Sequence, residues 1–450
     1  MSEREHWGSR TGFILAAAGS AIGLGNIWKF PFITGMYGGA AFVLAYLICI
    51  ALVGFPVMLI EFAIGRRTQR NPVGAFKALA PGTPWFMVGG LGVVAVFVIL
   101  SYYSVVAGWT LGYIFAAISG AFHNLAEPSQ AKDYFENFGA DPFKTIICHL
   151  FFMALVSFVV IKGVKKGIEK WSKILMPLLL VILVVLMIRG LTLPGAEDGV
   201  NFLVKPDFSK LNGNTILVAL GHAFFTLSLG MGAMITYGSY LSRKENLLSS
   251  AVIIVFLDTF IALMAGIAIF TAVFAHGLAP DGGPALIFHV LPTVFPHIPG
   301  GYFFGILFFL LLFIAAITSG ISLLEVVIAY FTDEKGWSRK TAVIVFGGLV
   351  FLVGVPSALS TGPLADWKIF FGMTFFDFMD YMSFKYMLPL GGFLMCIFVG
   401  YYWGAKEFID EIKSGNPAFS LRPVAAMVLI TIAGILILIT LVTGILGVGA

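Results

Sequence analysis

Charged residues and cysteine are both scarce in this chain of 450 residues, and each scarcity excludes a class of protein. Only 11% of the residues are charged, whereas 59% are hydrophobic, so the chain lacks the polar surface of a water-soluble domain. The three cysteines, Cys49, Cys148 and Cys396, lie in or beside apolar segments without metal-site spacing, and we expect them to be small buried residues. The sequence contains no phosphate-binding loop and no nucleophile motif. These absences argue against an ATP-driven pump or an enzyme.

Long apolar runs fill most of the chain instead. The mean hydropathy is +0.98, and the runs have helical periodicity rather than the alternation of membrane strands. A helix needs about 20 apolar residues to cross a bilayer. The sequence offers eleven such segments, near 13–35, 40–64, 86–119, 143–162, 174–190, 214–240, 248–276, 301–331, 341–356, 369–403 and 424–447. The first is too long for a cleavable signal peptide. We therefore predict an all-α integral membrane protein that lies in the lipid bilayer.

Basic residues gather on alternate connections between these segments. With the N-terminus inside, nineteen lysines and arginines fall on the cytoplasmic side and six fall outside, which is the positive-inside bias of membrane proteins. An odd number of spans then places the C-terminus outside. We expect a multi-pass protein of the cell (inner) membrane, and nothing in these loops suggests binding to nucleic acid.

The first apolar segment is interrupted in its middle, at residues 20–31. Gly23 and Gly25 are poor helix formers, and Pro31 follows with no N–H to donate. Unwound backbone at membrane depth is tolerated only where it is buried or lines a cavity. Freed carbonyls near 19–22 and the side chain of Asn26 could hold a small cation there. The alternative is a glycine-rich packing face between helices, which is the commoner use of glycine in membranes.

A matching interruption opens the sixth segment. Residues 224–232 place Gly230 and Gly232 inside another apolar run, five segments after the first. Interrupted segments at matching positions of two halves indicate an inverted-repeat transporter with its binding site between the repeats. Glu61 lies inside the second segment, where an unpartnered acid costs about 2.5–3.5 kcal/mol. We expect unwound backbone nearby to supply partner amides for its carboxylate.

Five motifs together resemble the neurotransmitter:sodium symporter family over nearly the whole chain. They are AIGLGNIWKFP at 21–31, GWTLG at 108–112, KGIEKWSKILMP at 166–177, FFTLSLGMG at 224–232 and AAITSGIS at 315–322. The resemblance is to bacterial eleven-helix members with the fold of the bacterial leucine transporter. It implies a leucine-transporter-type five-plus-five inverted repeat, with discontinuous helices 1 and 6 and one peripheral helix. The single transporter domain, 1–450, would comprise repeats at about 10–190 and 214–403 and an eleventh helix at about 424–447.

The resemblance also implies a sodium-coupled symporter with two sodium sites. The first would use the carbonyl of Ala21 with the side chains of Asn26, Thr226 and Asp258. The second would use the carbonyls of Gly19, Ile22 and Ala315 with the hydroxyls of Thr318 and Ser319. Such oxygen ligands suit a hard cation. Helical threonine and serine hydroxyls more often bond back to their own backbone, which is the alternative for the second set.

A substrate pocket beside these sites follows from the same resemblance. It would be lined by Ser20, Ala21, Leu24, Gly25, Ile99, Tyr103, Phe225, Thr226, Ser228, Met231, Ser319 and Leu323. Without the resemblance, such apolar residues would indicate ordinary core packing. Monoamine carriers of the family have an aspartate where this chain has Gly23. A substrate must therefore bring its own carboxylate, which favours an amino acid, and the apolar lining favours a hydrophobic or aromatic one.

Gates are implied at both ends of the pocket. Lys29 and Asp380 would form the outer pair over a lid of Tyr103 and Phe225, although relatives usually carry arginine at Lys29. The inner side would be closed by Arg4, Asp333, Trp7, Ser239 and Tyr240. Gly167 and Pro177 match the pair that lets the fifth helix of relatives unwind and admit water from the cytoplasm.

Three residues depart from the family pattern. His222 stands where glutamine is frequent, Glu325 lies in an apolar segment without an evident partner, and Asp258 replaces the asparagine of chloride-dependent members. Asp258 would supply the negative charge that chloride supplies in those members, so we predict chloride-independent import with proton counter-transport, the proton being shared with His222. Asp258 could instead ligate sodium without ever taking up a proton. A non-translocating amino-acid sensor and a carrier of an amine or betaine are the alternative functions, and the sequence does not indicate an oligomeric state.

Overall fold

The computed structural model describes residues 5–125, 127–280 and 286–446, and within these ranges it contains helices and no strand. Apolar side chains at helical spacing produce long helices in most of the predicted spans. Six of these are single helices: α6 (Phe86–Ile118), α8 (Pro142–Val160), α13 (Leu247–Ala275), α15 (Gly301–Lys335), α16 (Arg339–Leu359) and α20 (Pro423–Ile445).

Three further spans of the described chain include a π-helical turn. The second span runs through α3 (Ala40–Cys49) and α4 (Phe55–Thr68), and the tenth runs through α17 (Phe375–Met382), α18 (Leu388–Ile397) and α19 (Ala405–Gly415). The fifth span joins the turn Val164–Glu169 to α9 (Lys170–Leu191), with Pro177 inside the helix. This span is therefore helical throughout here, and the unwinding that the Gly167/Pro177 pair predicts is not present in this conformation.

The first and sixth spans are broken, as the glycine pairs predicted. The first consists of α1 (Arg10–Ala21) and a second piece in which the π-helical turn Gly25–Lys29 continues into α2 (Phe30–Met36), and the two pieces are bent by 47°. The sixth consists of α11 (Gly213–Thr226) and α12 (Ala233–Gly238). Between them, Gly230 and Gly232 have φ of 81° and 75°, which glycine adopts at no steric cost. Nine helical segments of the described residues are long and apolar enough to cross a membrane, and the bent first pair makes a tenth. The sixth of the eleven predicted spans corresponds to α11 and α12, neither of which is long enough to cross alone.

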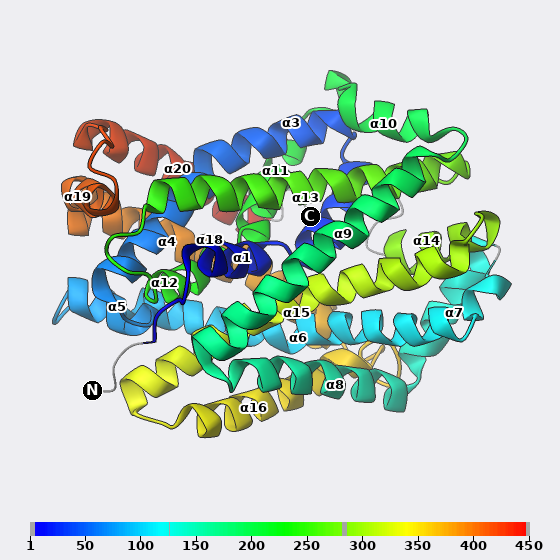
Figure 1. The fold of residues 1–450 in the computed structure, drawn as a ribbon, viewed down its shortest axis with the longest axis horizontal. Coiled ribbons are helices and arrows are strands. Elements are labelled where there is room, and N and C mark those ends of the chain that lie inside the picture. Colours follow the sequence, from blue (N-terminus) through cyan, green and yellow to red (C-terminus); the bar gives the residue numbers. More distant parts are fainter. Residues whose placement is uncertain (1–4, 126, 281–285, 447–450) are drawn as a thin grey trace.

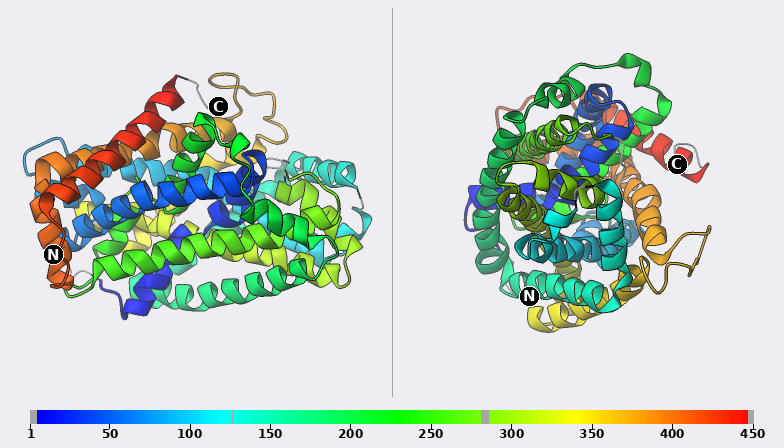
Figure 2. Two further views of the ribbon diagram at one scale, coloured as in Figure 1. Left: turned by 90° about the horizontal axis from the view of Figure 1, so that it is seen from above. Right: turned by 90° about the vertical axis from the view of Figure 1, so that its right-hand side faces the viewer.

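The long helices lie roughly side by side along the longest axis of the molecule (Figure 1). One end, which we call the tail end, holds the N-terminal segment, α5 (Pro72–Leu79), α12 and α19; the far end holds α7 (Pro128–Ala140), α10 (Ala196–Val204) and α14 (Leu291–Val294). In the two views of Figure 2, α20 lies along the outside of the bundle, where it packs on α18. Helix α1 contacts α9, α13 and α15, so its break lies inside the bundle.

Large apolar side chains also cover the outward faces of the long helices. Phe256 on α13 and Leu352 on α16 are 63% and 62% exposed, which would be costly in water but is neutral against lipid tails. The described residues thus present the surface of a multi-pass membrane protein.

Candidate transport site

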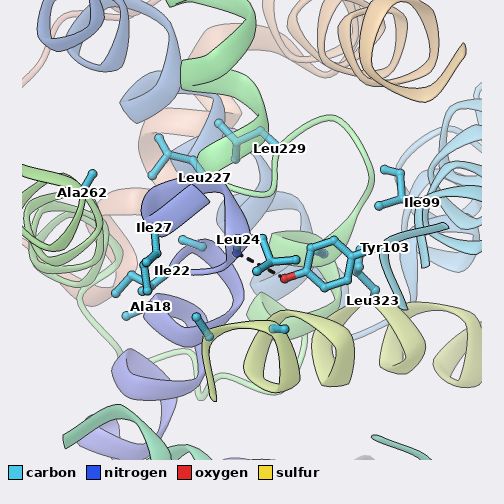
Figure 3. Packing of buried hydrophobic residues seen from close by; sticks show 14 of the residues in the cluster. Ala18, Ile22, Leu24, Ile27, Ile99, Tyr103, Leu227, Leu229, Ala262 and Leu323 are labelled. Carbon is cyan, nitrogen blue, oxygen red and sulfur yellow. Dashed lines mark hydrogen bonds between the residues drawn. The ribbon is translucent and has the colours of Figure 1, made fainter. Parts of the chain in front are cut away.

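The two broken spans meet around one central pocket. It is lined by all twelve residues predicted for the substrate, and by Gly23. Figure 3 shows Tyr103, Ile99 and Leu323 on one side of the α1 break, with Ile22 and Ile27 on the other. The cavity volume is about 30 Å³, which is close to the space of a water molecule. A larger molecule therefore requires the walls of this pocket to move outward.

Hydroxyl groups hold the two breaks together at the pocket. Leu24 N donates to the Tyr103 hydroxyl at 3.4 Å (Figure 3). The carbonyl of Ser20, one turn earlier, accepts from Ser228 Oγ at 2.8 Å and from Ser319 Oγ at 3.1 Å. Ser228 reaches it from a left-handed backbone conformation, with φ of 54°. Carbonyl and hydroxyl oxygens of three elements therefore converge where the helices are interrupted.

Asp258 lies at the centre of the predicted first cation site. Its carboxylate accepts from Asn26 Nδ2 at 2.8 Å, from Thr226 Oγ1 at 3.1 Å and from the Tyr46 hydroxyl at 3.3 Å. All four side chains are almost completely buried, so these bonds satisfy a group that would be costly to bury alone. Ala21 ends α1 and lines the pocket beside them. The structure thus brings all the predicted members of this set together.

Tyr46 is the member of this cluster that the sequence did not reveal. It lies on α3, and 212 residues separate it from Asp258. The only available signal was a phenol group in the middle of an apolar span, where a partner is needed. Its ring also packs against His222, with centroids 5.4 Å apart. His222 is buried, and among the described residues neither of its ring nitrogens has a hydrogen-bond partner.

The predicted second cation site lies where α15 crosses the end of α1. Thr318 packs closely against Gly19 there. If residue 19 had a Cβ atom, that atom would lie 3.2 Å from the Cβ of Thr318. Ile22, the residue that follows α1, has an extended conformation. Thr318 Oγ1 donates back to the Ala315 carbonyl at 3.0 Å, whereas Ser319 Oγ reaches across to the Gly19 carbonyl at 3.4 Å. One hydroxyl thus bonds to its own helix and the other bridges two helices.

Glu61 has the partner amides that the sequence predicted. Its carboxylate, fully buried on α4, accepts from Gly230 N at 2.8 Å, Met234 N at 3.2 Å and Ile235 N at 3.3 Å. These N–H groups belong to the unwound segment and to the first turn of α12, where a helix has unpaired donors and a positive dipole end. Glu61 therefore anchors the break in the sixth span.

A second cavity of about 440 Å³, which we call the vestibule, lies next to the pocket. Lys29 and Asp380 are among the residues that line it. The predicted outer pair, Lys29 and Asp380, is not in direct contact. Among the ion pairs of the described residues, with nitrogen and oxygen within 4.0 Å of each other, there is none between these two side chains. Lys29 Nζ lies instead 3.7 Å from the ring centroid of Phe384 and 4.6 Å from that of Phe225. These cation–π contacts hold the ammonium over aromatic rings.

At the tail end, the predicted inner residues are packed closely together. Trp7 N donates to the Tyr240 carbonyl at 3.2 Å, and Trp7 Nε1 donates to the Tyr237 carbonyl at 3.0 Å. Ser239 Oγ donates to a carbonyl of the same turn. Asp333 accepts from the backbone and side-chain nitrogens of Asn71, both at 3.3 Å. Arg4, the predicted partner of Asp333, lies outside the described residues.

Glu325, which the sequence left unexplained, belongs to this inner closure. Its carboxylate accepts from the Tyr240 hydroxyl at 2.6 Å and forms an ion pair with Arg339. Arg339 also donates to the Val160 carbonyl at 2.7 Å and lies 4.0 Å from Glu5. Glu325 thus links α15, the start of α16, and the N-terminal segment. The signal that could have found it was a basic residue at the start of the next helix.

Neutralising Glu325 is expected to loosen the tail end. Breaking a buried ion pair from one side costs about 3–5 kcal/mol, and in Glu325→Gln this cost falls on the closed arrangement of Tyr240 and Arg339. The reporter is a cysteine introduced at Ser239 in a chain whose three native cysteines are replaced. We expect it to react with a small maleimide at least about tenfold faster when Glu325 is replaced by Gln than when Glu325 is present. Glu407→Gln, on the exposed face of α19, is the matched control. An unchanged labelling rate in a folded Glu325→Gln variant would contradict this role.

Comparisons with known proteins identify the family. The model of the sodium:neurotransmitter symporter family matches residues 4–124 and 120–449. The chain belongs to this family. It is 43% identical to an uncharacterized sodium-dependent transporter of Bacillus subtilis (strain 168), over 93% of each chain. It is 34% identical to one of Methanocaldococcus jannaschii, over 92% of this chain and 86% of the relative.

A solved structure extends the comparison to the fold. The crystal structure of MhsT in complex with L-phenylalanine has 48% sequence identity and a TM-score of 0.91, covering 98% of this chain and 100% of that one. The leucine-transporter fold predicted from the motifs is therefore confirmed. The chain is a sodium-dependent transporter of the membrane and not an enzyme.

Proposed function

We propose that this symporter imports hydrophobic or aromatic amino acids together with sodium by alternating access. The observation that carries the proposal is the central pocket, whose lining includes Ile99, Phe225, Met231 and Leu323 and no charged side chain. Such walls favour an apolar side chain and leave a charged one without a partner. MhsT, with a similar fold, was crystallised with L-phenylalanine, which supports the same substrate class here.

The polar groups of the pocket suit the backbone part of an amino acid. Tyr103 places its hydroxyl beside the amide of Leu24 at the α1 break, where a substrate carboxylate would meet donors and the first sodium. Gly23 argues against an amine carrier, because even a Cβ atom there would lie 2.3 Å from Ser319 Oγ. A side chain at this position would require the Ser319 hydroxyl to move, and this chain has no acid here to pair with a ligand amine.

Two sodium ions would be carried with each substrate in this proposal. The first would be bound around Asp258 and the second between α1 and α15, by the residues named from the resemblance. Each sodium ion that crosses 100 mV contributes about 2.3 kcal/mol. Two ions supply about 4.6 kcal/mol, which is roughly a thousandfold accumulation of substrate.

Chloride independence and proton counter-transport complete the proposal. The carboxylate of Asp258 lies within the first cation set and would supply the negative charge that an anion supplies in chloride-dependent relatives. On the return step without sodium, a buried carboxylate is more stable when protonated. Tyr46 contacts both Asp258 and His222 and would connect them for the exchange of that proton.

The tail end would face the cytoplasm, with the C-terminus outside. Lys165 and Lys166 lie between the fourth and fifth spans, where the Lys165 side chain is next to Gly8 of the N-terminal segment. Arg339, at the start of α16, lies 4.0 Å from Glu5 of the same segment. These basic residues are therefore at the tail end, as the positive-inside rule requires. The two repeats, about 10–190 and 214–403, would then move against each other around the pocket.

Displacement of bound radiolabelled leucine tests the substrate class. We expect Leu, Met, Phe, Tyr and Trp to displace the label in sodium buffer. Gly, Asp and Lys should need a concentration at least about a hundredfold higher, because burying an unpartnered charge or losing a large apolar contact costs a few kcal/mol. Lysine or aspartate outcompeting leucine would overturn the proposal.

Uptake into proteoliposomes under an inward sodium gradient separates a transporter from a sensor. A transporter accumulates label well beyond its binding capacity, and a sodium ionophore releases it. A non-translocating sensor would retain at most one equivalent of substrate per binding site under the same conditions.

A further inference from the structure

Two histidine rings lie close together at the far end, outside the transport site. His276 directly follows α13, and His297 ends the short turn Phe295–His297 behind α14 (Figure 1). Their ring centroids are 6.0 Å apart, with an angle of 58° between the ring planes. His276 is half-buried and His297 is exposed. The two rings come from separate elements, and solvent can reach them.

The hydrogen bonds of these rings determine which nitrogen is available. His276 Nδ1 lies 2.8 Å from the Ala272 carbonyl, and His297 Nδ1 lies 2.8 Å from the Thr293 carbonyl. A carbonyl oxygen only accepts, so each Nδ1 carries the hydrogen and each neutral ring keeps a lone pair on Nε2. Histidines that bind metals are oriented in this way, with the second ring nitrogen donating to a carbonyl or carboxylate.

The spacing of the rings fits one ion between them. Zinc–nitrogen bonds are about 2.0–2.1 Å long, so two imidazoles on one tetrahedral ion have centroids about 5–6 Å apart. Each histidine also lies at the C-terminal end of a helical segment, where the free carbonyls favour a cation. The described residues include no group of three histidine, cysteine or acidic side chains that could hold a metal, so water would complete the coordination.

We propose that His276 and His297 bind one transition-metal dication of the zinc, nickel or copper type. The bound ion would tie the end of α13 to the turn that leads into α15. These helices carry Asp258 on one side and Thr318 and Ser319 on the other, so the tie restrains the two elements that hold the proposed sodium sites. The site itself does not depend on the proposed substrate.

Metal binding to the full-length protein, purified without a polyhistidine tag, tests the site. In a zinc titration against a chromophoric indicator, we expect one ion per chain, with affinity at least about tenfold weaker in His276→Gln and in His297→Gln. His123→Gln is the matched control, since His123 is exposed at the same end and packs against Tyr302 instead. Sodium-stimulated leucine binding without metal should be equal in all four proteins, which shows that each is folded.

Copper(II) binding supplies a second measurement. Its spectrum reports the nitrogens bound to the metal, which would not change if the two histidines only stabilised the fold. We expect its electron paramagnetic resonance spectrum to show two equatorial nitrogens in the wild type and one in either single variant. Zinc should also slow sodium-driven uptake in the wild type and not in the double variant. Absence of stoichiometric zinc binding, or zinc affinity unchanged in both single variants, would overturn the proposal; so would a copper spectrum without two nitrogens.

Discussion

Replacing Asp258 by asparagine is expected to abolish sodium-driven uptake in chloride-free buffer. The carboxylate lies within hydrogen-bond distance of Asn26 and Thr226, the side chains that would share the first sodium. At an effective dielectric constant of about 20, opposite unit charges about 4 Å apart attract by about 4 kcal/mol. Losing that attraction weakens sodium binding roughly a thousandfold. The asparagine side chain is nearly isosteric, so the loss reflects charge more than shape.

Chloride substitution shows whether this charge replaces an anion. Wild-type uptake should be the same in chloride and in gluconate, whereas Asp258→Asn should be inactive in gluconate and either remain inactive or recover in chloride. Asp198→Asn is the matched control, because Asp198 is exposed in the first turn of α10. Wild-type uptake that collapses in gluconate would contradict chloride independence. An Asp258→Asn protein with normal sodium affinity would contradict the role of the carboxylate in sodium binding.

Internal pH tests the proton that Asp258 would carry back. If the empty carrier returns with a protonated carboxylate, acidifying the lumen of proteoliposomes should change sodium-driven uptake by the wild type. No effect of luminal pH across the range in which the protein stays folded would leave Asp258 as a sodium ligand alone.

Removing both hydroxyls at Thr318 and Ser319 is expected to abolish sodium-stimulated substrate binding. Bonds from a polar group to a charge are worth about 1.5–3 kcal/mol each, so losing two weakens binding roughly a hundredfold or more. Ser319 already reaches from α15 to the carbonyl of Gly19, which places its oxygen at the proposed site. We expect the double Thr318→Ala, Ser319→Ala variant to bind leucine equally poorly with and without sodium.

Thr332→Ala is the matched control for this variant. Thr332 lies on the same helix and donates back to the Ile328 carbonyl at 2.9 Å, the kind of bond that Thr318 forms with Ala315. If these hydroxyls served only their own backbone, both variants would keep their sodium dependence. Retained sodium stimulation in the double variant would mean that the second site is elsewhere.

The sequence by itself determined the spans and their breaks, because both depend on local properties. Apolar length sets which segments can cross a membrane, and Gly23, Gly25, Gly230 and Gly232 mark where helices stop, since no side chain restrains their backbone. Glu61 could also be interpreted locally, because a buried acid needs donors and a nearby break offers free amides. The family resemblance named all twelve pocket residues, and the structure gathers them around one cavity.

Only the tertiary structure decided which distant groups became partners. Tyr46 and Asp258 are 212 residues apart, and Glu325 meets Tyr240 from 85 residues away. Lys29 shows the same dependence, since its ammonium lies over Phe384 rather than on Asp380. Such pairings depend on how whole helices pack, and alternative arrangements of one bundle differ by only a few kcal/mol. The pattern of residues along the chain therefore indicated which residues form the site, and the packing of the helices determined which of them are in contact.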